Sequence, residues 1–195
     1  MKKKKSTTRT AVAFIVMALI IVVVFAYLSN RSKQIAEARP ETITPVQEVL
    51  QRNLESNYPA SPKEVVKFYS EITRCFYSEE YSEEELTELA KKSRELFDDE
   101  LVANQTDEQY INALRRDIQS YKDEGKKISS YSVSSSTDVD YYDFQGDKWA
   151  QLYCIYSMRI KTQIQTIQER FLLRKYAKGH WKIFGWKLVE EEMEI

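Results

Sequence analysis

The sequence of 195 residues is poor in the residues that carry most catalytic and metal chemistry. It holds one histidine, two cysteines and four glycines. One histidine cannot supply a site built from several imidazoles, and two distant cysteines form no CxxC pair. The few glycines leave no glycine-rich phosphate loop, and GxSxG is absent. We therefore expect no catalytic residue, no metal and no cofactor, and we expect that the protein is not an enzyme.

The individual candidates for chemistry also have simple structural explanations. His180 precedes Trp181 in an expected turn, where a surface position is favoured over a catalytic one. Asp117 lies close to the apolar side of an expected helix, and solvent exposure is favoured for it as well. Cys75 and Cys154 have apolar neighbours, as buried free thiols usually do, although outside the cytoplasm they could pair. Both alternatives stay open for the cysteines.

An uninterrupted apolar run occupies residues 11–28, AVAFIVMALIIVVVFAYL. As a helix it would span roughly 27 Å, close to the thickness of the hydrocarbon core of a bilayer. Five cations precede it, so we expect a cytoplasmic basic tail at 1–10 and a transmembrane helix at 11–28. A cleaved signal peptide, ending near Ala26, is the alternative, but the run exceeds the usual 7–15 residues of such segments.

The remainder of the chain is acidic. From residue 41 onwards there are 21 Lys and Arg against 29 Asp and Glu, a net charge of −8. This balance argues against binding to nucleic acid or to anionic headgroups. We expect a juxtamembrane stalk at 29–44 and one extracytoplasmic domain at 45–195. The expected location is the cell membrane, with a single span and a cytoplasmic N-terminus.

Four capping-box patterns predict helix starts in the first half of this domain. They begin at Thr44, Ser61, Ser82 and Thr106, each followed three residues later by Gln or Glu. In this motif the hydroxyl accepts from the third amide and the longer side chain reaches back. Apolar residues at spacings of three and four follow each start, which is typical of a helix on a core. We expect the fourth helix to end at Gly125.

Alternating apolar residues replace the helical spacing after Lys127. Residues 128–139, 152–160, 167–176 and 181–189 fit strands, and 138–148 fits a loop or hairpin connection. A shift of apolar parity beside Gly185 predicts a β-bulge. The expected fold class is α+β: a single N-terminal transmembrane helix, then helices packed on a strongly curved antiparallel sheet of about four strands.

Two stretches carry a resemblance to a known superfamily. Residues 61–69, SPKEVVKFY, resemble the opening helix of the nuclear-transport-factor-2-like superfamily, which has a cystatin-like cone fold. Residues 170–176, RFLLRKY, with 179–183, GHWKI, resemble its closing hairpin. The resemblance covers about residues 60–190 and implies a bent sheet that wraps around helices and leaves a pocket. Members include isomerases, dehydratases and non-catalytic domains, so the fold does not choose a function.

Aromatic residues and acidic residues supply the two candidate surfaces. Thirteen tyrosines, eight phenylalanines and three tryptophans are present, and several could line a pocket instead of filling a core. The candidate lining residues are Tyr69, Tyr121, Tyr156, Trp181 and Trp186, with Tyr77 and Tyr153 also considered. The run 79–100 has ten acids and three bases, and its Glu83, Glu84 and Glu88 could form a docking face.

The sequence therefore favours a non-catalytic scaffold or protein-interaction module of the bacterial envelope. Its expected partners are the lipid bilayer, through residues 11–28, and an envelope protein; a homo-oligomer stays open. A small-molecule-binding domain that uses the cone pocket is the alternative, and an isomerase-like or dehydratase-like enzyme ranks third.

Overall fold

Helices and strands occupy separate halves of residues 43–176 and 178–189, the part of the chain that this computed structural model describes. The helices are α2 (Pro45–Gln51), α3 (Pro62–Ser78), α4 (Glu83–Arg94), α5 (Asp99–Ala103) and α6 (Asp107–Asp123). The strands are β1 (Lys126–Val133), β2 (Asp140–Phe144), β3 (Asp147–Ile160), β4 (Gln163–Lys175) and β5 (Trp181–Leu188). A short 3-10 turn, Ser136–Asp138, joins β1 to β2.

The four predicted helix starts are confirmed. Complete capping boxes join Thr44 to Gln47, Ser82 to Glu85 and Thr106 to Gln109, while Ser61 accepts from the Glu64 amide at 3.2 Å. Helix α6 stops before Gly125, whose φ of 65° suits the residue after a helix. The sequence reading missed α5, whose first turn is capped by Asp98.

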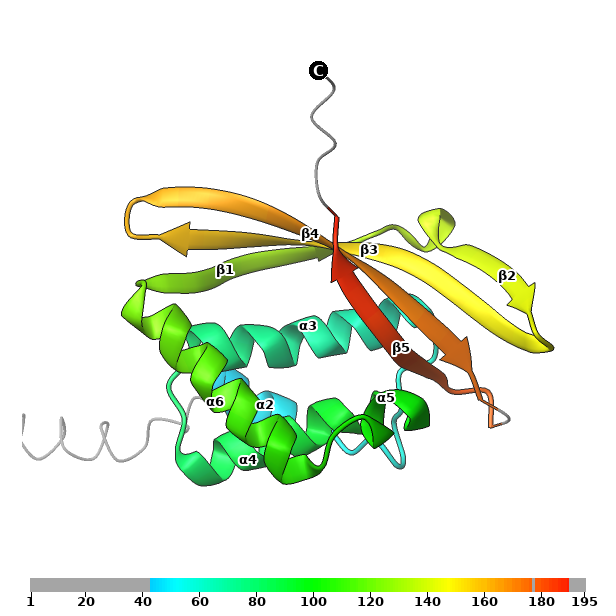
Figure 1. Cartoon of the computed structure of the whole chain (residues 1–195), viewed down its shortest axis with the longest axis horizontal. Helices are drawn as coiled ribbons and strands as arrows, with labels where there is room; N and C mark the ends of the chain where they lie inside the picture. Colours follow the sequence, from blue (N-terminus) through cyan, green and yellow to red (C-terminus); the bar gives the residue numbers. More distant parts are fainter. Residues whose placement is uncertain (1–42, 177, 190–195) are drawn as a thin grey trace, which may run out of the picture. The chain divides into compact units, whose positions relative to one another are not determined.

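The sheet is fully antiparallel, and β3 is its longest strand. Its order is β1-β3-β4-β5, and β2 also pairs with β3 (Figure 1). The first part of β3 pairs with β2 over 147–151, and its second part pairs with β1 over 154–160. Strands β1 and β2 therefore follow one another along the same edge of β3.

The expected fold class needs two corrections. The sheet has five strands instead of about four, because 140–144, interpreted as a connection, pairs in continuous register with β3. Within the described residues no helix combines the length and apolar character needed to cross a membrane. The transmembrane helix expected at 11–28, the basic tail and all but the last two residues of the stalk lie outside those residues.

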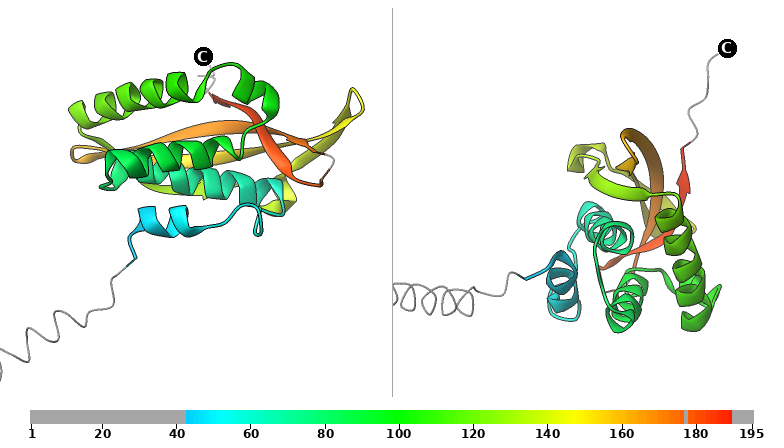
Figure 2. Two further views of the ribbon diagram at one scale, coloured as in Figure 1. Left: turned by 90° about the horizontal axis from the view of Figure 1, so that it is seen from below. Right: turned by 90° about the vertical axis from the view of Figure 1, so that its left-hand side faces the viewer.

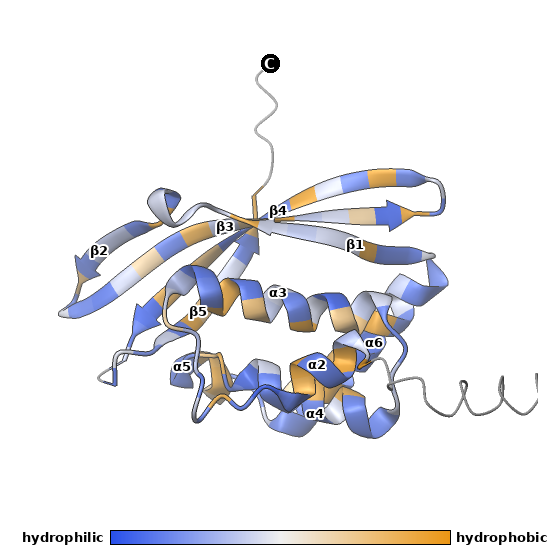
Figure 3. Ribbon diagram, turned by 180° about the vertical axis from the view of Figure 1, so that it is seen from behind, coloured by the Kyte–Doolittle hydropathy of each residue, from blue (hydrophilic) through white to orange (hydrophobic). Residues whose placement is uncertain are grey.

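The core lies between the helices and the inner face of the sheet. Helix α3 lies directly below β1 and β3, the strands curve over it, and α2 and α6 lie on opposite sides of α3 and α4 (Figures 1 and 2). Hydrophobic and hydrophilic residues alternate along β3 and β4 (Figure 3). Phe171 and Leu173 of β4 are fully buried, and so are Leu152 and Cys154 of β3. Alternation therefore gives β3 and β4 one face each on the core.

Two local irregularities shape the closing strands. The turn between β3 and β4 contains Lys161, whose φ is 55°, so a lysine takes the position where a glycine, asparagine or aspartate is usual. In the last pair Leu172 lies opposite Gly185 and Leu173 opposite Ile183, which leaves Phe184 as an extra residue. The predicted β-bulge beside Gly185 is confirmed.

Candidate functional site

A cavity of about 240 Å³ lies between α3, α6 and the inner face of the sheet. We call it the tyrosine cavity. Helices α3 and α6 line one side, and β1, β3, β4 and β5 line the other. Its lining residues are Tyr69, Thr73, Phe76, Tyr77, Tyr110, Leu114, Asp117, Tyr121, Ile128, Tyr156, Ile167, Glu169 and Trp186. Asp117 and Trp186 are exposed, so the cavity opens to solvent on that side.

The helical wall contains a polar pair and an aromatic pair. The hydroxyl of Tyr77 on α3 donates a hydrogen bond to Asp117 Oδ2 on α6. The rings of Tyr77 and Tyr121 lie 4.4 Å apart between centroids, at an angle of 38°. Burial and the bond to Asp117 raise the pKa of Tyr77 well above its usual range. Tyr77 therefore stays a neutral donor at physiological pH.

The sheet wall contributes one carboxyl group. Glu169 has the same parity on β4 as the buried Phe171, and it lies opposite Cys154 of β3 and Leu188 of β5. The side chain therefore faces the helices, where it is half-buried. Burial raises the pKa of Glu169 to about 7, with no contribution from an ion pair or a hydrogen bond. Within the described part of the chain, Glu169 thus has no counter-charge.

The bulge on β5 places Trp186 in the cavity wall. Before the bulge Trp181 and Ile183 face the core, and after the extra residue Trp186 takes up that face. Its ring centroid lies 5.2 Å from that of Tyr69 and 5.6 Å from that of Phe97. Burial raises the pKa of Tyr69, to which no hydrogen bond contributes. The Tyr69 hydroxyl, the Glu169 carboxyl and the Trp186 indole nitrogen therefore line the cavity without a hydrogen-bond partner among the described residues.

The structure brings together four of the five predicted lining residues. Tyr69, Tyr121, Tyr156 and Trp186 all line the tyrosine cavity. Tyr156 is almost fully buried, and its hydroxyl lies 2.8 Å from Ser70 Oγ, so it supports the cavity floor. Trp181 is the exception, because it lies before the bulge and lines a separate hollow with Tyr141 and Trp149. Of the two tyrosines also considered, Tyr77 lines the cavity.

Tyr153 and the candidate docking residues lie elsewhere. Tyr153 lines an outer hollow together with Arg170 and Lys187. Glu83, Glu84 and Glu88 are all exposed on α4. Glu83 is already engaged, since its carboxylate accepts from Arg115 of α6 at 3.1 Å. The structure thus separates the acidic face from the tyrosine cavity.

The remaining sequence candidates have structural surroundings that account for them. Cys75 and Cys154 are free and buried, and burial raises the pKa of both thiols, that of Cys75 to about 11. Such thiols are poor nucleophiles at neutral pH. The His180 ring stacks on Tyr58 with centroids 4.2 Å apart. In the part of the chain that is described, no group of three or more His, Cys, Asp or Glu could hold a metal ion.

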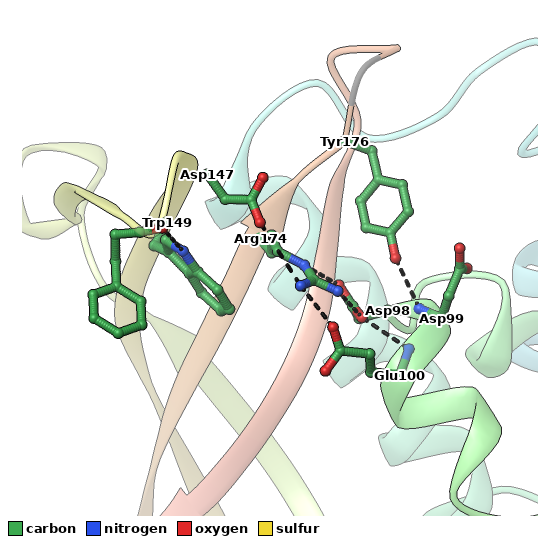
Figure 4. A network of polar contacts seen from close by, with 8 residues as sticks. Asp98, Asp99, Glu100, Asp147, Trp149, Arg174 and Tyr176 are labelled. Carbon is green, nitrogen blue, oxygen red and sulfur yellow. Dashed lines mark hydrogen bonds and ion pairs between the residues drawn. The ribbon is translucent and has the colours of Figure 1, made fainter.

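A second polar network fastens the sheet to the helical half (Figure 4). Arg174 on β4 donates two bonds to the fully buried Asp98, at 2.9 and 2.7 Å, and a third to Glu100 at 2.8 Å. Asp98 in turn caps α5, and the hydroxyl of Tyr176 accepts from the Asp99 amide at 2.9 Å. The bidentate geometry fixes the start of α5 against the end of β4. This network therefore has a structural role.

Sequence reasoning missed the two walls' most distinctive polar groups. Glu169 was not placed in the pocket, although its parity with Phe171 and Leu173 was a usable signal. Asp117 was assigned to solvent, and it is indeed exposed, yet it closes one end of the cavity through Tyr77. That pairing links α3 to α6 across 40 positions, and no local pattern predicts it.

Comparisons with known proteins identify the family and leave the activity open. The NMR solution structure of TraH, a candidate transfer protein from the Gram-positive conjugative plasmid pIP501, aligns with 69% of this chain and 98% of its own. The identity is 12% and the TM-score is 0.36, values too low to indicate a shared fold or function. No curated protein shows significant similarity. The profile of the family described as "Domain of unknown function (DUF6715)" matches residues 1–186, and the chain belongs to that family.

Proposed function

We propose that the domain binds a small molecule in the tyrosine cavity. The observation that carries the proposal is the space of about 240 Å³ between α3, α6 and the sheet, which side chains leave unfilled. Aromatic lining with a few polar groups is typical of small-ligand sites. Drug-sized ligands usually occupy about 300–1,000 Å³, so the ligand expected here is small. The pocket implied by the nuclear-transport-factor-2-like resemblance also supports the proposal.

The sequence favours an interaction module first and a small-molecule binder second, and our proposal reverses that ranking. A filled cone would support a scaffold, whereas an open aromatic pocket supports ligand binding. We expect binding without turnover, although a carboxyl with a pKa of about 7 and a Tyr–Asp pair are group types used in acid–base catalysis. Conversion of a bound compound would therefore replace the binding role with an enzymatic one.

A screen of small fragments against the full chain tests the proposal. Binding is followed by the midpoint of thermal unfolding, and NMR of the mixture reports any chemical conversion. Thr73→Phe should plug the cavity, since Thr73 lies in its α3 wall. Thr87→Phe is the matched control, because Thr87 on α4 bonds to the carbonyl four residues earlier, as Thr73 does, but lies outside the cavity.

The proposal expects fragments that stabilise the wild type and Thr87→Phe but not Thr73→Phe. Binding to the folded state raises the unfolding midpoint by mass action, so an occupied cavity is directly visible. A wild type that no fragment stabilises would overturn the proposal. Fragments that stabilise Thr73→Phe as strongly as the wild type would overturn it as well.

A second candidate function is the protein-interaction module that the sequence favours. It is supported by an outer groove of about 390 Å³ whose lining includes Tyr142, Phe144, Trp149 and Phe184. Phe144 on the edge strand β2 is 55% exposed, which is unusual for a phenylalanine with only a structural role. The module's place in the envelope rests on residues outside the described range and stays a prediction.

Two variants of the tagged full chain test this second candidate. Phe144→Ser removes the exposed ring, and a triple reversal of Glu83, Glu84 and Glu88 to Lys removes the acidic face. Under this candidate at least one variant should lose a partner that co-purifies with the wild type. Loss through the triple reversal should be clearer at low salt, because surface charges are screened as ionic strength rises. Unchanged partners with both variants would count against an interaction role.

A further inference from the structure

We propose that the tyrosine cavity takes a small organic cation that carries a methylated ammonium group. This inference rests on the proposed function and names the chemical class of the ligand. Seven aromatic side chains and two carboxyl groups line the cavity, and among the described residues no lysine or arginine does so. An anion would meet two carboxyl groups without a compensating base. A neutral ligand would leave the ionised form of Glu169 without a counter-charge.

The aromatic rings are arranged on both walls. The Tyr77 and Tyr121 rings come from α3 and α6, with centroids 4.4 Å apart. The Tyr69 and Trp186 rings come from α3 and β5, with centroids 5.2 Å apart. Ring faces attract cations through their quadrupole, by about 0.5–1 kcal/mol when exposed and about 2 kcal/mol when desolvated. Rings from several elements around one space suit methylated ammonium groups, which are bulky and poorly hydrated.

The same lining argues against a metal ion as the cation. Hard metal ions take six or more oxygen ligands, whereas this cavity offers two carboxyl groups, one of them already accepting from Tyr77. Two protein cations lie near cavity rings: Arg94 Cζ is 5.3 Å from the Tyr110 centroid, and Lys126 Nζ is 5.6 Å from the Tyr121 centroid. Arg94 is paired with Asp107 at 2.7 Å and Lys126 with Glu124 at 2.6 Å, and neither lines the cavity. Among the described residues, no cation therefore occupies the inner side of the cavity.

Glu169 is the counter-charge that the ligand would meet. Its ionisation is suppressed by burial, which raises its pKa to about 7. A bound cation favours the ionised carboxylate, so binding releases a proton whenever Glu169 was protonated beforehand. Affinity should accordingly rise as the pH increases from about 5 to about 7 and should level off above it. The pH dependence of the affinity therefore reports on the ionisation of Glu169.

The other titratable groups around Glu169 do not produce this pattern. They are Tyr69 and Tyr77 from α3, Tyr110, Asp117 and Tyr121 from α6, and Cys154 and Tyr156 from β3. Burial raises the pKa values of the tyrosines and the thiol, which keeps them neutral through this range. Asp117 is the one other acid, and it is exposed and bonded to Tyr77.

Choline and its neutral isostere 3,3-dimethylbutan-1-ol test the inference on the full chain. Their binding is measured by calorimetry and by the fluorescence of Trp186, which lines the cavity. Choline should bind at least about tenfold more tightly than the isostere, a difference of about 1.4 kcal/mol. Glu169→Gln should weaken choline binding about tenfold and abolish its pH dependence. Glu71→Gln is the control, since Glu71 is half-buried outside the cavity and bonds to Tyr131.

A second variant and a second ligand complete the experiment. Tyr121→Leu removes a half-exposed ring. It should weaken the binding of choline and leave the binding of the isostere unchanged. Short-chain phosphatidylcholine carries the same cation as a lipid headgroup: tighter binding than choline would assign the source to lipid, and weaker binding to a free cation. Equal affinity for choline and for the isostere would overturn the inference that the ligand is a cation, while the proposal of small-molecule binding would still stand. Choline failing where neutral fragments bind would do the same.

Discussion

Tyr77 and Asp117 join α3 to α6 through a hydrogen bond at the edge of the tyrosine cavity. Tyr121, one turn after Asp117, places its ring beside Tyr77, so a polar and an aromatic contact act at the same point. Because the pair holds α6 against α3, and both helices line the cavity, it fixes the spacing of the helical wall. Its strength is therefore a property of the site as well as of the fold.

A double-mutant cycle on Tyr77→Phe and Asp117→Asn should give a coupling energy of about 1 kcal/mol. Hydrogen bonds to charged groups contribute about 1.5–3 kcal/mol, and solvent around the exposed Asp117 lowers this value. Denaturant unfolding measures the coupling. Gln119→Ala, exposed on the same helix, should show none with Tyr77→Phe. Strictly additive losses for Tyr77 and Asp117 would show that the contact contributes nothing.

Glu169→Gln should change how stability depends on pH. Below about pH 4.5 the carboxyl is protonated in both states. Between about 4.5 and 7 the unfolded chain releases the proton while the folded chain retains it, so wild-type stability falls as the pH rises. The full loss is about 3 kcal/mol, at 1.36 kcal/mol per pKa unit. Unfolding free energies at pH 4 to 8 should show this decline in the wild type and its reduction in the variant. Parallel curves would contradict the raised pKa.

Two acids that contact the same arginine should differ sharply in importance. Asp98→Asn should destabilise the domain by about 3–5 kcal/mol, because Asp98 is fully buried and Arg174 would lose its bidentate partner. Glu100→Gln should cost less than about 1 kcal/mol, because Glu100 is 64% exposed. Chemical denaturation of both variants measures the difference. Similar losses would show that burial does not control this network.

The two tryptophans of β5 should separate stability from binding. Trp181→Ala should cost about 3–5 kcal/mol, because its side chain is 7% exposed and packs in the core. Trp186→Ala should cost much less, since Trp186 is 37% exposed, but should weaken any cavity ligand. Thermal unfolding and ligand titration test the pair. Equal destabilisation would place both rings in the core.

Local chemistry explains which parts of the fold the sequence predicts. The four caps act over three residues, so Thr44, Ser61, Ser82 and Thr106 mark their helices directly. Parity along a strand is equally local, and it predicted the bulge beside Gly185. Strand β2 was missed because all five of its residues are exposed, which removes the alternation that identifies a strand. A connection was expected between residues 160 and 167, but the turn is shorter and β4 begins at Gln163, because Lys161 takes a backbone conformation that is atypical for lysine.

The site was less accessible to sequence reasoning because it depends on tertiary contacts. Aromatic residues were recognised as candidates by their number, and four of the five named positions line the cavity. The partner of Tyr77 comes from a different helix. Glu169 is isolated because the described elements packed around it place no counter-charge beside its carboxyl. Neither relation leaves a periodic signal. The expected place of residues 11–28 and the envelope role stay predictions.

The bulge at Phe184 divides β5 into two stretches whose residues are constrained in different ways. Residues before it contact the core, so their replacement is limited by packing; Trp186 beyond it borders the cavity, so its replacement is limited by the ligand. Regular pairing of the same residues without a bulge would turn Trp186 to the opposite face of the sheet, whereas deletion of Phe184 would restore regular pairing and keep Trp186 in the cavity wall. Relatives that lack the bulge would therefore keep a complete pocket only where the aromatic residue follows the position of Ile183 by an even number of residues.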